Sequence, residues 1–304
     1  MLNSLHLLRF VFFCLLFMSL KAQKIPLIID ADTANEVDDL YALVGALAEP
    51  RFDLLGLTAA QFHTSPYASQ NTALESHKIN ADLLRLTKVA IPNLIGSPQP
   101  LFDKTTAAPS EASQFIIQKA QIHTPENPLS IIILGSCTNV ASALIEAPEI
   151  LKNIKVYYLG FWHDPKTNSY NKKEFNTGND PIATNLLLDM EGLDLTVMTA
   201  TTSQKLVFKK KDVTKMLAAP SALGTYLLDR WENYTRWWTT KDPEKKEWIM
   251  WDVAIVEALA TPELVTKKVF LTPKENKQRN IKIYTAIDVP KTTGQYWSKI
   301  ADLL

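Results

Sequence analysis

The stretch that decides the fold is LIIDADTANEVDDLYALVGAL, residues 27–47. It continues an apolar run, Ile25 to Ile29, that has the length of a β-strand. After a set of acids, apolar residues recur at the i, i+3, i+4, i+7 spacing that is typical of one face of a helix. These apolar residues are Leu40, Leu43, Val44 and Leu47, and the acids before them are Asp30, Asp32, Glu36, Asp38 and Asp39. The stretch therefore predicts a strand, an acidic turn and a helix.

The acidic turn is a candidate metal site. In open α/β sheets, ligands bind at the carboxyl ends of the strands, which is where this turn is expected to lie. Crowded carboxylates raise one another's pKa unless a cation lies among them, and hard oxygen ligands at this density favour Ca²⁺ or Mg²⁺. An N-cap with favourable acids in the first helical turn would explain one or two acids, but not all five.

Residues 1–22 have the pattern of an export signal. A basic start precedes an apolar run, Val11 to Leu20, which is too short for the roughly 20 residues of a membrane span. The small residue Ala22 precedes the expected cleavage site at Gln23, and a membrane-lying anchor is the alternative. The mature chain would keep a single cysteine, Cys137, and so no internal disulfide. We expect a periplasmic or secreted protein without a stable membrane anchor after cleavage.

Residues 23–304 are expected to form one domain, because no boundary or linker interrupts them. Continuous Ile, Leu and Val runs alternate with helical patterns and predict an α/β fold with a mostly parallel open sheet, covered on both faces. Strands are expected at 54–60, 88–94, 129–134, 154–159, 193–200 and 281–287, and helices at 69–85, 253–259 and 294–304. The tryptophan-rich stretch 231–251 is expected to form a helix pair over the mouth of the site, with plain core packing as the alternative. Lysine plus arginine equals aspartate plus glutamate, 32 each, which gives no support for nucleic acid as a partner.

Four further polar stretches fall where strands should end or where a helix should begin. They are Gln61 to Thr64, Leu134 to Asn139, Asn168 to Asp180, and Trp248 to Asp252. Together they would bring asparagine, glutamate and aspartate side chains to the rim that carries the acidic turn. Such a ring of acceptors and amide donors suits a polyhydroxylated ligand such as a sugar, although loop polarity or helix capping explains each stretch taken alone.

In order and spacing, these motifs resemble the inosine–uridine-preferring nucleoside hydrolase family over essentially the whole mature chain. The resemblance is carried by Asp30-Ala-Asp32 with Asp38-Asp39, Leu134-Gly-Ser-Cys-Thr-Asn139, Glu174-Phe-Asn176 with Asp180-Pro181, and Trp251-Asp252. It implies a Rossmann-like fold and a Ca²⁺-dependent hydrolysis of the N-glycosidic bond of ribonucleosides, which gives free base and ribose. The partner would be a small-molecule nucleoside, and the sequence allows a homo-oligomer.

The resemblance also implies roles for individual residues. Asp32, Asp39, Asp252 and the backbone carbonyl of Leu134 match the family's Ca²⁺ ligands. Asp32 also matches the base that deprotonates the metal-bound water. Asp38, Asn168, Glu174 and Asn176 match the residues that hold the ribose, and His63 stands where many members have asparagine. A metal ion lowers the pKa of bound water, and carboxylates suit the oxocarbenium-like state through which the bond breaks.

Two further departures concern the acidic turn and the leaving base. Asp32 and Asp38 are six positions apart, farther than in the commonest family pattern, Asp-x-Asp-Pro-Gly-x-Asp-Asp, so Asn35 or Glu36 is a candidate contact to metal or ligand. Trp251 stands where many members have the histidine proposed to protonate the leaving base. Purine-preferring members resemble this chain in having tryptophan there and are thought to activate the base by stacking. A purine preference is therefore slightly favoured, with His163 as the alternative acid and simple packing as the alternative role of Trp251.

Two other classes of protein would explain part of this set of motifs. A strand followed by Asp30-x-Asp32-Thr33 resembles the first motif of haloacid-dehalogenase-type phosphatases, which bind Mg²⁺, but this reading leaves Asp38-Asp39 and Glu174-Phe-Asn176 unexplained. A non-catalytic exported nucleoside- or sugar-binding protein would use the same pocket. Ribose release from a nucleoside would exclude the receptor, and Mg²⁺-dependent hydrolysis of a generic phosphoester would favour the phosphatase.

Overall fold

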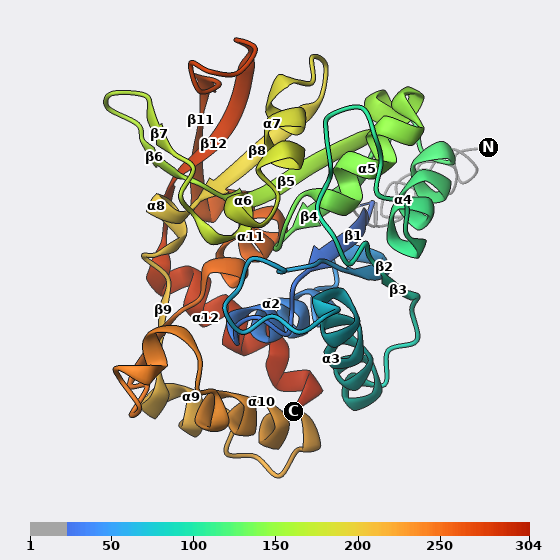
Figure 1. The fold of residues 1–304 in the computed structure, drawn as a ribbon. Coiled ribbons are helices and arrows are strands. Elements are labelled where there is room, and N and C mark those ends of the chain that lie inside the picture. Colours follow the sequence, from blue (N-terminus) through green and yellow to red (C-terminus); the bar gives the residue numbers. More distant parts are fainter. Residues whose placement is uncertain (1–22) are drawn as a thin grey trace, which may run out of the picture.

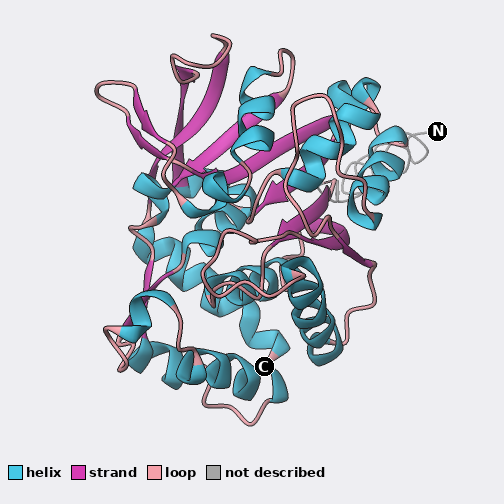
Figure 2. Ribbon diagram, in the orientation of Figure 1, coloured by secondary structure: helices cyan, strands magenta, loops and turns pink. Residues whose placement is uncertain are grey.

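A sheet of eight strands runs through the middle of the molecule, with helices on both faces (Figure 1) (Figure 2). The computed structural model describes residues 23–304, so the export signal expected at 1–22 lies outside the described residues. Across the sheet the strands are β11 (Val265–Leu271), β12 (Asn280–Ile287), β8 (Asp194–Thr199), β5 (Ile154–Gly160), β4 (Leu129–Ile133), β1 (Ile25–Ala31), β2 (Phe52–Ala59) and β3 (Asn93–Ile95). Every neighbouring pair is parallel except β11 with β12.

The apolar runs are continuous because the strands are buried on both faces. In β1, Leu27 and Ile29 belong to one hydrophobic cluster and Ile28 to the other, as the alternation of side chains along a strand requires. The first cluster packs against α2 (Asp38–Leu47), α3 (Thr72–Thr87), α11 (Trp251–Ala260) and α12 (Val289–Ile300). The second packs against α4 (Glu111–Gln121), α5 (Thr138–Glu146) and α7 (Pro181–Asp189). The predicted doubly covered sheet is thus confirmed.

The order of the strands reverses between β1 and β4. From β1 the chain moves outward to β2 and β3, then returns to place β4 on the other side of β1 and continues to β5 and β8. The carboxyl ends of β1 and β4 therefore open toward different helices, α2 and α5, and leave a crevice between them. Ligands of open α/β sheets bind at such a point, and the acidic turn after β1 lies there.

The remaining elements are short and surround the sheet ends. They are β6 (Trp162–Asp164), β7 (Ser169–Asn171), α6 (Phe175–Asn179), α8 (Ala200–Ser203), β9 (Val207–Lys209), α9 (Lys210–Met216), α10 (Ala222–Asn233), β10 (Glu247–Ile249) and the 3₁₀ turns η1 (Pro148–Asn153), η2 (Trp237–Thr240), η3 (Pro262–Leu264) and η4 (Ala301–Leu303). No helix in residues 23–304 combines the length and the apolar character that crossing a bilayer requires.

Several expected boundaries are wrong for local reasons. The third strand spans only Asn93–Ile95, because Lys88, in the left-handed conformation with φ 57°, ends α3 where the strand was expected to begin. The closing helix begins at Val289 and not at 294, since Asp288 caps it by accepting from the backbone N–H of Lys291. The tryptophan-rich stretch is not a helix pair: after α10 it contains η2 and the strand β10. The edge strand β11 was not expected, because its exposed, lysine-containing sequence lacks an apolar run.

A buried ion-pair network fastens the helices of the first layer to one another. Lys299 Nζ on α12 lies 3.1 Å from Glu49 Oε2 and 2.5 Å from Glu257 Oε1 on α11. Both glutamates are almost fully buried, and Arg51 Nε pairs with Glu49 Oε1 at 2.7 Å. The ammonium group of Lys299 therefore links α12 to Glu257 on α11 and to Glu49, which follows α2.

Candidate active site

A cavity of about 610 Å³ opens at the carboxyl ends of β1, β4 and β5. Volumes of this size are typical of pockets for small ligands. Its floor is acidic and its walls are aromatic. The floor carries Asp32, Asp38, Asp39, Glu174 and Asp252, and the walls carry Glu36, Trp162, Phe175, Trp237, Trp238 and Trp251.

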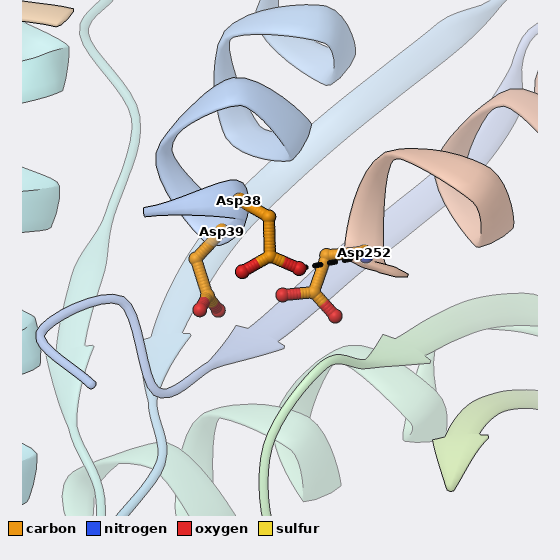
Figure 3. Close-up of side chains that lie close together, drawn as sticks. All are labelled: Asp38, Asp39 and Asp252. Atoms are coloured by element: carbon orange, nitrogen blue, oxygen red, sulfur yellow. Dashed lines mark hydrogen bonds between the residues drawn. The ribbon is translucent and has the colours of Figure 1, made fainter. Parts of the chain in front are cut away.

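Three of the floor acids meet from two helices whose N-termini face each other. The carboxylate oxygens of Asp38, Asp39 and Asp252 lie within 4.8 Å of one another, and the side chains point into a common space (Figure 3). The backbone N–H of Asp252 donates to Asp38 Oδ2 at 3.2 Å. Helix capping does not explain these acids, because the N-cap positions of α2 and α11 are Val37 and Met250.

Buried carboxylate oxygens in this floor have no hydrogen-bond partner. They are Oδ2 of Asp32, Oδ1 of Asp39 and Oδ1 of Asp252. No lysine or arginine forms an ion pair with these three acids within residues 23–304. An unpaired buried charge is strongly unfavourable. Unpartnered carboxylate oxygens that converge from separate elements fit a hard divalent cation.

Burial raises the pKa of every carboxyl group in the floor, and repulsion between neighbouring acids adds to this rise for the four aspartates. Burial is the larger cause for Asp32, and the negative charges of Asp38 and Glu174 add to it. Burial likewise raises the pKa of Asp39 and Asp252, with neighbouring aspartates as the next cause. Since a divalent cation would favour the ionised form of all of them, the residues present fit such an ion.

Leu134 brings the end of β4 to the same cavity. Its carbonyl oxygen accepts a hydrogen bond from Asn176 Nδ2 at 2.6 Å, and a carbonyl has a second lone pair for another partner. Gly135 makes this approach possible: a Cβ on Gly135 would lie 3.0 Å from Cβ of Asp32. The four metal ligands expected from the sequence, Asp32, Asp39, Leu134 and Asp252, therefore all line one cavity.

Glu174 and Asn176 also reach the cavity, from the first turn of α6. The carboxylate of Glu174 caps this helix and accepts from the backbone N–H groups of Asn176 and Thr177, each at 3.0 Å. Burial nevertheless raises the pKa of Glu174. The cap fixes the direction of the carboxylate, and the bond to Leu134 fixes that of the Asn176 amide.

Three expected site residues are not brought to the cavity. Asn168 lies at the tip of the β6–β7 hairpin, where its Nδ2 donates to the Leu271 carbonyl at 3.3 Å. His163 Nε2 lies 2.9 Å from Asn168 Oδ1, and His63 Nδ1 lies 2.9 Å from Gln61 Oε1. None of the three lines the cavity among the residues that the structure describes.

The reasons are local. The chain before Glu174 folds back as a hairpin, which directs Asn168 toward β11 and away from the floor. Alternation along β6 turns Trp162 into the cavity and His163 to the opposite side, where its ring packs 4.6 Å from both Tyr170 and Phe270. Burial lowers the pKa of His163.

The tryptophan-rich stretch 231–251 was expected over the mouth of the site, and Trp237, Trp238 and Trp251 do line the cavity, whereas Trp162 and Phe175 were not expected there. The ring of Trp251 meets Trp162 edge-on, with centroids 6.0 Å apart, and Trp237 meets Phe175 edge-on at 5.2 Å. Trp237 Nε1 donates to Asn35 Oδ1 at 3.2 Å, and Trp238 Nε1 donates to Glu36 Oε1 at 2.9 Å. The longer acidic turn thus anchors the wall, and the density of tryptophan between 231 and 251 was the available signal.

Comparisons with known proteins agree with this arrangement. The sequence profile described as "Inosine-uridine preferring nucleoside hydrolase" matches residues 27–297. The chain is 24% identical over 254 residues to a probable uridine nucleosidase 2 of Arabidopsis thaliana, covering 77% of this chain and 78% of the relative. It is 26% identical over 200 residues to the non-specific ribonucleoside hydrolase RihC of Klebsiella pneumoniae, covering 57% of this chain and 62% of that protein.

Solved structures share the fold. An inosine-guanosine nucleoside hydrolase superposes with a TM-score of 0.69 at 16% identity, and a purine-preferring ribonucleoside hydrolase from Gardnerella vaginalis with 0.64 at 22%. Each alignment covers 91% of this chain and 98% of the other.

Proposed function

Since the chain belongs to the inosine–uridine preferring nucleoside hydrolase family, we propose that it hydrolyses the N-glycosidic bond of ribonucleosides with the help of Ca²⁺, giving free base and ribose. The observation that carries this proposal is that Asp32, Asp39 and Asp252, each with an unpartnered buried oxygen, line one cavity of about 610 Å³, where the carboxylates of Asp39 and Asp252 come within 4.8 Å of each other. Hydrolysis of a phosphoester would not require the aromatic walls or a carboxylate at the position of Glu174.

The ion would be held by Asp32, Asp39, Asp252 and the Leu134 carbonyl, the oxygen donors that Ca²⁺ prefers. When bound, Ca²⁺ would orient a water molecule and lower its pKa. Asp32 would accept the proton of the attacking water. Asp38, anchored by the Asp252 backbone N–H, accepts hydrogen bonds from ribose hydroxyls.

Glu174 and Asn176 hold the rest of the ribose from α6. The sequence also predicted Asn168 for this role, but Asn168 does not line the cavity. The carboxylate of Glu174, whose direction the helix cap fixes, stabilises the positive charge that develops on the ribose ring as the C1′–N bond breaks. Trp251 presents its ring to the leaving base. Stacking is stronger on the larger face of a purine, so we propose a purine preference.

The experiment that tests the function is incubation with a panel of nucleosides, with and without a chelator, followed by an assay of reducing sugar. Ribose release that stops with the chelator and returns with Ca²⁺ supports the proposal. Binding without release would identify a receptor, and Mg²⁺-dependent release of phosphate from a generic phosphoester would identify a phosphatase.

Calcium is expected to stabilise the fold as well as the reaction. At a Ca²⁺ concentration 100 times its Kd, the free energy of unfolding should rise by about 2.7 kcal/mol. Urea unfolding of the chelator-treated protein, with and without Ca²⁺, measures this rise. Asp252→Asn should lose most of it, because one oxygen donor of the cluster becomes a neutral amide. A larger rise with Mg²⁺ than with Ca²⁺ would contradict the choice of ion.

Trp251→Ala is expected to lower kcat/KM on inosine by about tenfold, since base–aromatic stacking contributes ~1–3 kcal/mol. A nitrophenyl riboside, whose leaving group needs no activation, should be affected much less. His163→Ala is the matched control and should spare both substrates, because His163 lies outside the cavity. If His163→Ala caused the selective loss on inosine and Trp251→Ala did not, the stacking role would be wrong.

A further inference from the structure

The upper part of the cavity is an aromatic box with carboxylates among its rings. The box is formed by Trp162, Phe175, Trp237, Trp238 and Trp251, which are half-buried. Glu36 lines the same part of the cavity, and the exposed side chains of Asp242 and Glu247 stand at its mouth. The negative faces of aromatic rings together with carboxylates are the chemistry that binds organic cations.

Glu36 is held in the wall through one oxygen only. Its Oε1 accepts from the indole N–H groups of Trp238, at 2.9 Å, and Trp248, at 3.0 Å. Its Oε2 accepts no hydrogen bond from any residue in the described part of the chain, and Glu36 lines the cavity. A carboxylate that accepts from an indole N–H also pushes electron density onto the ring. The face of Trp238 is therefore a better partner for a positive charge than a free indole would be.

The net charge of the residues that line the cavity also favours a positively charged ligand. Acidic side chains outnumber Lys173, the single basic residue that lines the cavity within residues 23–304, and one divalent cation does not reverse the balance. Such a cavity repels the phosphate of a nucleotide and attracts a positively charged ligand.

The side chains of the cavity also decide which kind of base can leave. No histidine lines the cavity in the part of the chain that the structure describes, so the side chain that most often protonates a leaving base is missing from it. A cationic ring needs no such proton. When its C1′–N bond breaks, the electron pair goes to the ring nitrogen, the ring leaves neutral, and water adds to C1′ while its proton passes to Asp32 and then to solvent.

We propose that Glu36 and the faces of Trp237 and Trp238 form a subsite for a positively charged leaving group. The substrates then include ribosides of quaternary rings, such as an N-ribosylpyridinium or an N7-alkylated purine riboside. The inference rests on the proposed hydrolysis of ribosides and names the class of base that this site recognises.

The test uses two C-ribosides that no hydrolase can cleave, 4-ribosyltoluene and 4-ribosyl-N-methylpyridinium, which have nearly the same shape and differ by one charge. Their Kd values are measured by quenching of tryptophan fluorescence in the Ca²⁺-loaded protein. The cation should bind about tenfold more tightly, as a desolvated cation–π contact supported by a carboxylate allows. In Glu36→Gln, which keeps an oxygen for the two indoles, this preference should fall to about threefold or less.

Glu191→Gln is the matched control, because Glu191 is exposed and pairs with Lys277 outside the cavity. It should keep the full preference. Equal Kd values for the two ligands in the unchanged protein would overturn the proposal, and so would a preference that Glu36→Gln leaves intact. Both readouts are independent of turnover, so they remain decisive even if ribose release from inosine fails and the proposed hydrolysis is abandoned.

Discussion

Asp32→Asn is expected to lower kcat on inosine by ~10²–10⁴, the usual contribution of a positioned general base. The amide keeps the shape of the side chain but cannot accept the proton of the attacking water. It also removes one of the charges that the cation would bind, so KM and the Ca²⁺ requirement are measured beside kcat. Steady-state kinetics at saturating Ca²⁺ then separate the loss of the base from the loss of the ion.

Asp30→Asn is the control for this variant. Asp30 lies near the end of β1, two residues before Asp32, and is buried, but its Oδ1 accepts from Thr58 Oγ1 at 2.6 Å and from Asn139 Nδ2 at 2.8 Å, outside the cavity. Activity within a few-fold of the unchanged protein is expected. Full activity in Asp32→Asn, or an equal loss in the two variants, would show that Asp32 is not the base.

Lys299→Met is expected to lower the free energy of unfolding by about 3–5 kcal/mol, the usual effect of removing one partner from a buried ion pair. The methionine fills a similar volume but leaves Glu257 and Glu49 buried without the ammonium group that they share. Urea unfolding measures the change. Lys277→Met removes an exposed partner of Glu191 and should change the free energy by less than about 1 kcal/mol.

The loss in Lys299→Met should depend on pH. Burial raises the pKa of Glu257, and Lys299 partly offsets this rise. A carboxyl group with a raised pKa destabilises the fold once it is ionised, so its penalty is absent below the unfolded-state value, about 4.3, and complete above the folded-state value. Without Lys299 the folded-state pKa of Glu257 rises further. The difference between the two proteins should therefore be largest near pH 8 and shrink toward pH 5. An equal loss at both pH values would mean that packing, and not charge, is responsible.

The turn after β1 could be predicted because two periodicities meet in it. The apolar run before Asp30 and the helical spacing after Asp39 leave only the acids for the turn, and the structure has a strand and α2 at these places. The approach of Asp252 to Asp39 was expected from the ends of elements that share one rim, and they do lie together. Both predictions rest on regular, well-buried elements.

What could not be predicted depends on short, irregular segments. Whether Asn168 reaches the floor depends on the β6–β7 hairpin, which a sequence position alone does not reveal. The position of Trp237 was also not predictable, because its backbone adopts a left-handed conformation with φ 56° in an irregular segment. Its ring reaches the wall because Tyr67, Phe175 and Asn35 hold it from three distant segments. No local pattern encodes such contacts.

The acids of the floor come from opposite ends of the chain, and this sets the order of events during folding. Asp38 and Asp252, which share a hydrogen bond, are 214 positions apart. A chain that has not yet paired β1 with β4 and docked α11 on α2 presents no cluster for an ion to join. Calcium therefore cannot act as a nucleus for folding, as it can where one short loop supplies every ligand. A Ca²⁺ ion would bind a scaffold that the hydrophobic clusters have already built, so synthesis must reach α11 before the site exists at all.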